Sequence, residues 1–147
     1  MDREYYMRLA LELARQAGEG GDVPVGCVIV KDGEVIGRGQ NRRERTGSAL
    51  GHAEIEAIHE ANLALGDWRL DGCEIYVTLE PCPMCAGAIM NSRISVLVYG
   101  AREAQTGSCA SVLNLFEENY PSRPAIYAGV LAEESASLLR EFFRGKR

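Results

Sequence analysis

The chain has 147 residues, of which 46% are hydrophobic and 25% are charged, and its formal net charge is −5. This composition is typical of a globular domain and excludes an intrinsically disordered chain. No apolar run approaches the ~20 residues that a membrane-spanning helix needs, and the N-terminus shows no apolar signal core. We therefore expect a single soluble domain over residues 1–147, located in the cytoplasm and not attached to a membrane.

The cysteines and arginines narrow the class of function further. Five cysteines at irregular spacing indicate metal-binding or reactive thiols rather than a disulfide framework. The negative charge argues against binding nucleic acid by bulk electrostatics, but local basic sites are compatible with it. Arginine suits phosphate, although charged clusters usually only face water. The arginines gather in two groups: Arg38, Arg42, Arg43 and Arg45, and then Arg140, Arg144 and Arg147.

The N-terminal part of the chain predicts a helix followed by a hairpin. Apolar residues at helical spacing predict a helix over Glu4–Ala17, which Gly18–Gly21 ends. The β-rich runs Val25–Val30 and Glu34–Gly39 follow. Asp32-Gly33 between them supplies the left-handed geometry that a hairpin needs, so we expect two antiparallel strands.

After the hairpin, strands alternate with helices. We expect helices over His52–Leu65, Cys82–Asn91 and Ala132–Phe143, and strands over Cys73–Leu79, Ile94–Tyr99 and Ala125–Ala128. The sequence does not decide whether a further helix precedes the last strand. This order favours an α/β fold with three layers (α/β/α), a mixed sheet of about five strands with helices on both faces.

Two segments at strand-to-helix junctions carry the candidate chemistry. They are His52-Ala53-Glu54 and Pro81-Cys82-Pro83-Met84-Cys85. Helix N-termini can converge at the carboxyl ends of the strands, where such sheets bind ligands. Pro83 fits the first helical position with Cys82 as the cap, so Cys82 and Cys85 share a face. The helix dipole lowers the pKa of such thiols and favours the thiolates that bind metal.

With His52 as a third ligand, the two cysteines predict a zinc site. A His-Cys-Cys set is one ligand short of a closed tetrahedral site, and an open position is typical of catalytic zinc. We expect one Zn²⁺ per chain, with a water completing the coordination. If Glu54 reaches past the helix end, it can pass a proton from this water to a substrate ring, which predicts hydrolytic deamination. The alternative is a closed structural site with Cys73 or His59 as fourth ligand.

The sequence resembles the zinc-dependent cytidine-deaminase-like superfamily and, more closely, the bacterial tRNA-specific adenosine deaminases. The resemblance runs almost end to end and is carried by Val23-Pro-Val-Gly26, Gly37-Arg-Gly-Gln-Asn41, His52-Ala-Glu54, the run Tyr76–Ile89 and Phe142-Phe-Arg144. It implies a cytidine-deaminase-like fold and a homodimer. It also implies conversion of adenosine to inosine at the wobble position of a tRNA anticodon stem-loop.

The resemblance also implies roles for single residues. His52, Cys82 and Cys85 would hold zinc, and Glu54 would move protons. Asn41 would read the flipped base, since an amide can both donate and accept, although an Asn after Gly39 can also simply form a turn. The other residues expected at the substrate are Val23, Val25, Ala53, Pro81, Arg42, Arg43, Phe143 and Arg144.

The chain departs from the family pattern around the rim of the expected site, at Gly51, Glu103, Gln105, Pro121 and Ser122. Two other functions stay open. One is deamination of a free nucleobase or nucleoside such as guanine or cytosine. The other is a non-catalytic RNA-binding subunit, against which the intact Glu54 argues. For the homodimer we expect an interface on the small, apolar helix Pro83–Asn91.

Overall fold

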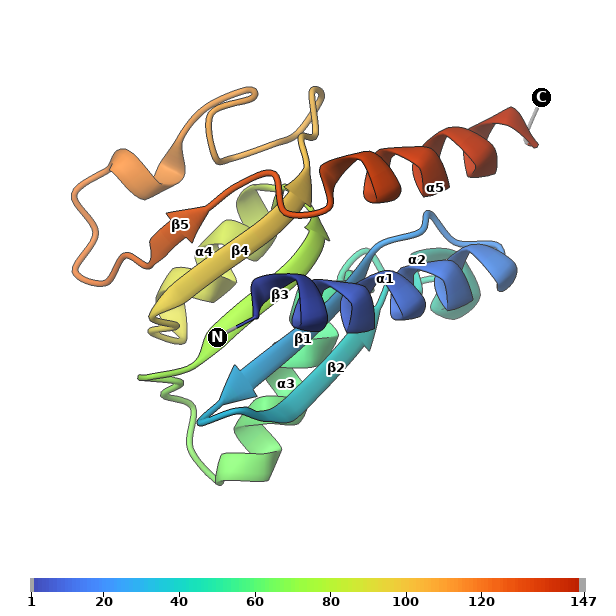
Figure 1. Cartoon of the computed structure of the whole chain (residues 1–147). Coiled ribbons are helices and arrows are strands. Elements are labelled where there is room, and N and C mark those ends of the chain that lie inside the picture. The colour runs from blue at the N-terminus through green and yellow to red at the C-terminus, as the bar shows by residue number, and fades with distance from the viewer. Residues whose placement is uncertain (1, 146–147) are drawn as a thin grey trace.

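The computed structural model describes residues 2–145, which surround a five-stranded mixed sheet (Figure 1). The strands are β1 (Gly26–Lys31), β2 (Glu34–Gln40), β3 (Glu74–Leu79), β4 (Val96–Ala101) and β5 (Ala125–Tyr127). Their order is β2-β1-β3-β4-β5. β1 is antiparallel to β2 and β3, whereas β3, β4 and β5 are mutually parallel. The predicted mixed α/β sheet is confirmed.

Helices cover both faces of this sheet, which confirms the predicted three-layer (α/β/α) fold. α1 (Arg3–Glu19) and α5 (Ala132–Arg144) pack on one face, and α3 (Ala53–Leu65) and α4 (Pro83–Asn91) pack on the other (Figure 1). Within residues 2–145, no helix has both the length and the apolar character needed to cross a membrane. Because helices cover both faces of the sheet, the buried hydrophobic residues lie at the two interfaces between helices and sheet.

The hairpin between β1 and β2 forms as the sequence predicts. Asp32 and Gly33 at its tip have φ values of 50° and 81°, the left-handed geometry expected of such a turn. The two strands then pair antiparallel from Gly26 opposite Gln40 to Lys31 opposite Glu34, with a one-residue register shift between Ile29 and Val30.

Most elements begin or end one or two residues away from their expected bounds, and three differences are notable. The sequence does not predict the short helix α2 (Arg43–Thr46), because none of its residues is buried and it has no apolar stripe. In place of the helix that the sequence left undecided, the segment between β4 and β5 has a 3₁₀ turn, η1 (Leu115–Glu117), and an isolated β-bridge between Cys109 and Asn114. β4 begins at Val96 rather than at Ile94, because the Ile94 N–H donates to the carbonyl of Ile89 and does not join the sheet.

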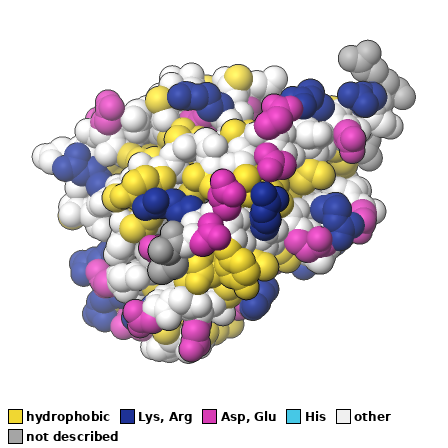
Figure 2. All heavy atoms as spheres, in the orientation of Figure 1, with side chains coloured by type: hydrophobic (Ala, Val, Ile, Leu, Met, Phe, Trp, Pro, Cys, Tyr) yellow, Lys and Arg dark blue, Asp and Glu magenta, His cyan; other side chains and the backbone are white. Residues whose placement is uncertain are grey.

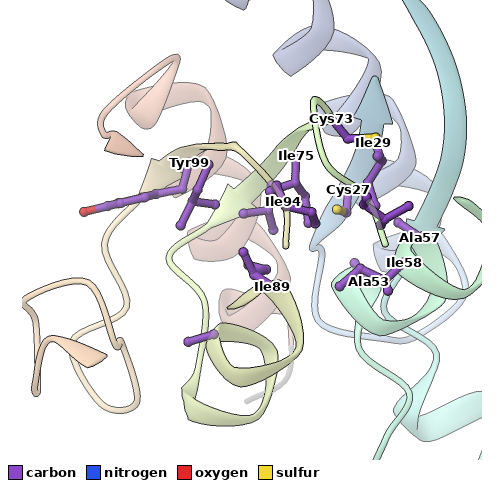
Figure 3. Packing of buried hydrophobic residues seen from close by; sticks show 14 of the residues in the cluster. Cys27, Ile29, Ala53, Ala57, Ile58, Cys73, Ile75, Ile89, Ile94 and Tyr99 are labelled. Carbon is purple, nitrogen blue, oxygen red and sulfur yellow. The ribbon is translucent and has the colours of Figure 1, made fainter. Parts of the chain in front are cut away.

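The core on the α3 and α4 side is apolar and fully enclosed. Ala53, Ala57 and Ile58 of α3 lie against Cys27 and Ile29 of the sheet (Figure 3). The buried cysteines Cys27, Cys73 and Cys109 pack in this core, as their positions in the sequence indicate.

Two glycines of β2 let α3 approach the sheet closely. A Cβ at Gly39 would overlap the carbonyl oxygen of Ala53, and one at Gly37 would overlap the carbonyl oxygen of Ala57. The backbone of α3 therefore rests directly on β2. This contact fixes where the first turn of α3 lies relative to the sheet.

Candidate metal and active site

The first turns of α3 and α4 converge and bring three ligand side chains together. His52 is the N-cap of α3, and Cys82 is the N-cap of α4 with Pro83 at the first helical position, as predicted. The Nδ1 atom of His52 lies 3.6 Å from Sγ of Cys82 and 3.5 Å from Sγ of Cys85. The three ligand atoms lie within 4.8 Å of one another, close enough to share one ion.

The donor set of this cluster fits zinc. One imidazole and two thiols are ligands that catalytic zinc uses in proteins, with a fourth position left for water or substrate. Among residues 2–145, the cluster consists of His52, Cys82 and Cys85, and neither Cys73 nor His59 joins it. His59 is exposed on α3, and Cys73 is buried in the core. The closed structural site with either residue as fourth ligand is therefore not formed.

The thiols and the imidazole influence one another strongly. A hydrogen bond from the Cys85 thiol lowers the pKa of Cys82 to about 4, although burial opposes this shift, and a second hydrogen bond from His52 adds to it. The same bond to Cys82, together with burial, raises the pKa of Cys85. The hydrogen bond to Cys82 also raises the pKa of His52. Cys82 is thus held as a thiolate, the form that binds metal.

Glu54 lies beside the ligand cluster although it is only two residues beyond His52. Its side chain is buried, with 4% of the residue exposed, and it lines the same cavity as His52 and Cys82. Burial raises the pKa of Glu54 to about 7. A carboxyl with a pKa near neutrality can both accept and return a proton, as general acid–base catalysis requires.

A cavity of about 920 Å³ opens over these residues, and most of the predicted substrate-binding residues line it. The predicted residues on its wall are Val23, Val25, Asn41, Arg43, Ala53 and Phe143. Three others do not reach it. Nε of Arg42 donates to Oε2 of Glu56 across 2.8 Å, Pro81 is buried, and Arg144 is exposed at the end of α5. Arg147 lies outside the described residues.

Asn41 forms a turn, one of the two alternatives that the sequence left open, and it also lies on the cavity wall. Its side chain closes a turn, because Nδ2 donates to the carbonyl of Val23 and Oδ1 accepts the Arg43 N–H, each across 3.3 Å. Asn41 is also part of the cavity wall. Both bonds lie at the long end of the range for hydrogen bonds.

Part of the cavity wall comes from residues that sequence reasoning did not assign to the substrate. The loop after β4 contributes residues 102–106, and Glu80, Met84 and Leu139 add to it. Glu103 and Gln105, noted only as departures from the family pattern, belong to this loop. Burial alone would raise the pKa of Glu80, but hydrogen bonds from Ser111, Cys109 and Glu103 hold it below its ordinary value. Two signals pointed to Glu80: it directly follows β3, and it lies within the run Tyr76–Ile89 that carries the family resemblance.

Comparison with known proteins identifies the family. Residues 1–101 match the model of the cytidine and deoxycytidylate deaminase zinc-binding region. The match covers more than half of the chain and includes His52, Cys82 and Cys85. The chain belongs to this zinc-binding deaminase family.

Relatives with a more specific name match this deaminase over nearly its whole length. The tRNA-specific adenosine deaminase of Bacillus subtilis (strain 168) is 46% identical over 145 residues, which cover 98% of this chain and 90% of the relative. That of Agrobacterium fabrum (strain C58 / ATCC 33970) is 46% identical over 147 residues, which cover 99% and 97%. The resemblance seen in the sequence motifs is confirmed.

Solved structures share the fold of the deaminase. A structure from a study of A-to-I editing by tRNA:A34 deaminases at the wobble position of transfer RNA superimposes with a TM-score of 0.89. It is 45% identical, and the match covers 92% of this chain and 99% of that one. Guanine deaminase from Bacillus subtilis has a TM-score of 0.68 at 32% identity, with 98% and 95% covered. The expected cytidine-deaminase-like fold is confirmed.

Proposed function

We propose that this deaminase is a zinc-dependent hydrolase that converts adenosine to inosine at the wobble position, A34, of a tRNA anticodon. The observation that carries the proposal is a buried acid, Glu54, beside a three-ligand His-Cys-Cys cluster at the floor of an open cavity. The relatives named tRNA-specific adenosine deaminase, at 46% identity, support the choice of substrate.

The roles of the residues follow from their positions in the cavity. His52, Cys82 and Cys85 would hold zinc, which when bound lowers the pKa of a water and so supplies a nucleophile at neutral pH. Glu54 accepts a proton from the attacking water and delivers it to the purine ring nitrogen. It then takes the second proton from the hydroxyl that the water has added to the ring carbon and delivers it to the amine, so that the carbon–nitrogen bond breaks, ammonia leaves and the water oxygen stays on the ring as a carbonyl.

The rest of the cavity wall would hold the flipped base. Val23, Val25 and Ala53 supply apolar walls, and Asn41 exchanges its long bonds to the backbone for bonds to the purine edge. Pro81 lies under the wall rather than on it, where its carbonyl accepts the N–H of Ser108 across 2.9 Å. Pro81 would therefore shape the pocket without contacting the base.

Charge would guide the RNA backbone to the cavity mouth. The face formed by α1 and α5 carries acidic and basic side chains side by side (Figure 2), including the pairs Arg8–Glu134 and Arg140–Glu133. Such a face offers no continuous basic surface. We therefore assign the phosphates flanking the flipped base to Arg43, which lines the cavity as Phe143 does, and to Arg42 and Arg144, which directly neighbour these two residues in the chain.

The proposal extends to assembly and location. We infer a homodimer that uses α4, where Gly87 is exposed and Ala88 is half-buried, because small residues allow a partner to approach closely. A shared site would grip a stem-loop larger than the cavity of one chain. With a tRNA as substrate, we expect the enzyme to act in the cytoplasm.

One assay tests the function directly. The purified protein is incubated with an anticodon stem-loop carrying adenosine at the wobble position, and in parallel with free adenosine, guanine, cytosine and cytidine. We expect inosine in the stem-loop and no ammonia from the free compounds. Ammonia from guanine, without inosine in the RNA, would overturn the proposal in favour of the activity named for the guanine deaminase of similar fold.

A further inference from the structure

Glu80 is a buried carboxylate that no step of the proposed reaction uses. It is 2% exposed and directly follows β3, two residues before Cys82. One of its oxygens, Oε2, accepts the backbone N–H groups of Cys109 across 2.8 Å and of Ser111 across 3.2 Å. The other, Oε1, accepts the N–H of Glu103 across 3.1 Å and the hydroxyl of Ser111.

All four hydrogen bonds come from one loop, the segment 103–111 that follows β4. Residues 102–106 of this loop and its approach line the cavity together with His52 and Glu54. Beneath them, Gly107 packs so tightly against the Glu80 carboxylate that a Cβ would overlap it. The loop that forms part of the cavity wall is thus folded around a single negative charge.

The charge of Glu80 cannot be replaced by an amide of the same shape. Each carboxylate oxygen faces at least one backbone N–H, and a backbone N–H cannot become an acceptor. In either orientation, a glutamine would point its NH₂ group at one of these donors. A carboxylate alone satisfies every donor that the loop presents.

We propose that Glu80 is a positioning residue, which fixes the segment 103–111 as a wall of the cavity and thereby sets how well the substrate binds. The proposal rests on the function proposed above. Glu80 also connects this wall to the metal cluster, because Pro81 and Cys82 follow it directly and the Pro81 carbonyl accepts the N–H of Ser108. Glu80 and Pro81 bind the loop, and the metal ligand Cys82 is the next residue in the chain. These adjacent residues therefore fix the position of the loop relative to the ligands on α4.

The test uses the full-length Glu80→Gln variant and three measurements. In steady-state kinetics with the stem-loop we expect KM to rise by about tenfold or more, because charged hydrogen bonds are lost, while kcat changes by less than about threefold. In hydrogen exchange, amides of the segment 103–111 should exchange faster, and those of α3 and α4 should not. Zinc content should stay that of the wild type.

Glu74→Gln is the matched control. Glu74 lies at the other end of β3, where its half-buried carboxylate accepts the hydroxyl of Tyr76 across 2.7 Å. This variant also replaces a hydrogen-bonded carboxylate by an amide, but far from the loop along the strand. It should leave KM and the exchange of the segment 103–111 unchanged.

Ser111→Ala provides a second variant that keeps the carboxylate and removes one donor. It should shift exchange and KM in the same direction as Glu80→Gln, to a smaller extent. Wild-type KM and loop exchange in both variants would overturn the proposal. Loss of zinc with a collapse of kcat would also overturn it, in favour of a role at the metal. If the wild type fails to act on the stem-loop, only the proposed function fails, and hydrogen exchange still decides the role of Glu80.

Discussion

Arg45 and Asp22 form an ion pair that joins the segment before β1 to the short helix α2 after β2. Nε of Arg45 donates to Oδ2 of the fully buried Asp22 across 2.9 Å. The guanidinium also donates to the side chain of Gln40 and to the carbonyl of Asn41, each across 3.0 Å. The pair therefore holds the turn on which Asn41 lies at the cavity wall.

Removing the charge of Asp22 should destabilise the fold. Burial alone would raise the pKa of Asp22, but the bonds from Glu44 and Arg45 hold it below the ordinary 3.8. The stabilisation is thus complete above pH 3.8 and is lost as the pH falls through the lower pKa of the folded state. Asp22→Asn should lower the free energy of unfolding at pH 7 by about 1–3 kcal/mol.

Urea denaturation of wild type and Asp22→Asn at a series of pH values measures this effect. The difference between them should shrink as the medium becomes more acidic than pH 3.8. Asp67→Asn is the control, because Asp67 pairs with Arg69 on the surface, where ion pairs contribute little. A constant difference over the whole pH range would contradict the role of the Asp22 charge.

Zinc binding should depend on all three residues of the cluster, His52, Cys82 and Cys85. The purified protein should hold about one zinc per chain, and His52→Ala, Cys82→Ala and Cys85→Ala should each hold much less, because two remaining ligands bind weakly. Metal analysis after extensive dialysis gives the comparison. Cys73→Ala, which removes a buried thiol outside the cluster, should keep its zinc. Full zinc in all three ligand variants would refute the assignment.

Glu54→Gln should separate metal binding from catalysis. An amide fits the same buried site but cannot accept and return a proton, so deamination should fall by about 10²–10⁴-fold or more. Zinc content and the unfolding transition should stay close to those of the wild type. Substantial remaining activity would remove Glu54 from the proton transfers.

Binding of RNA should weaken with salt in a way that reports on single arginines. Each lost phosphate contact should flatten the slope of log K against log salt by about 0.7–0.9. We expect this change for Arg43→Ala and Arg144→Ala. The change should be smaller for Arg42→Ala, because Arg42 is already paired with Glu56. Unchanged affinity and slope in all three variants would show that these side chains only face water.

The oligomeric state can be read from light scattering at micromolar concentration. The wild type should have twice the mass of one chain. Ala88→Arg should reduce both this mass and the deamination of the stem-loop, because an arginine on α4 would separate the partners. A fully active monomer at the same concentration would exclude the dimer as a requirement for function.

The metal cluster was predictable from the sequence, whereas the wall built on Glu80 was not. Zinc demands particular side chains, so His52, Cys82 and Cys85 leave a visible pattern. Glu80 instead binds mainly backbone N–H groups, which every residue except proline carries, so most of the donors in the loop require no particular side chain. The helix α2 was not predicted for the same reason. It has no apolar face, and it is held in place by a hydrogen bond from the backbone N–H of Glu44 to the side chain of Asp22.

The close approach of α3 to β2 makes tolerance to mutation uneven along a single strand. Gly37 and Gly39 touch neither the metal cluster nor the cavity, yet any side chain there would push the first turns of α3, and with them His52 and Glu54, away from the sheet. Arg38 between them is exposed and free of this constraint. In a library of active variants randomised over β2, glycine should therefore survive at positions 37 and 39, while position 38 diversifies.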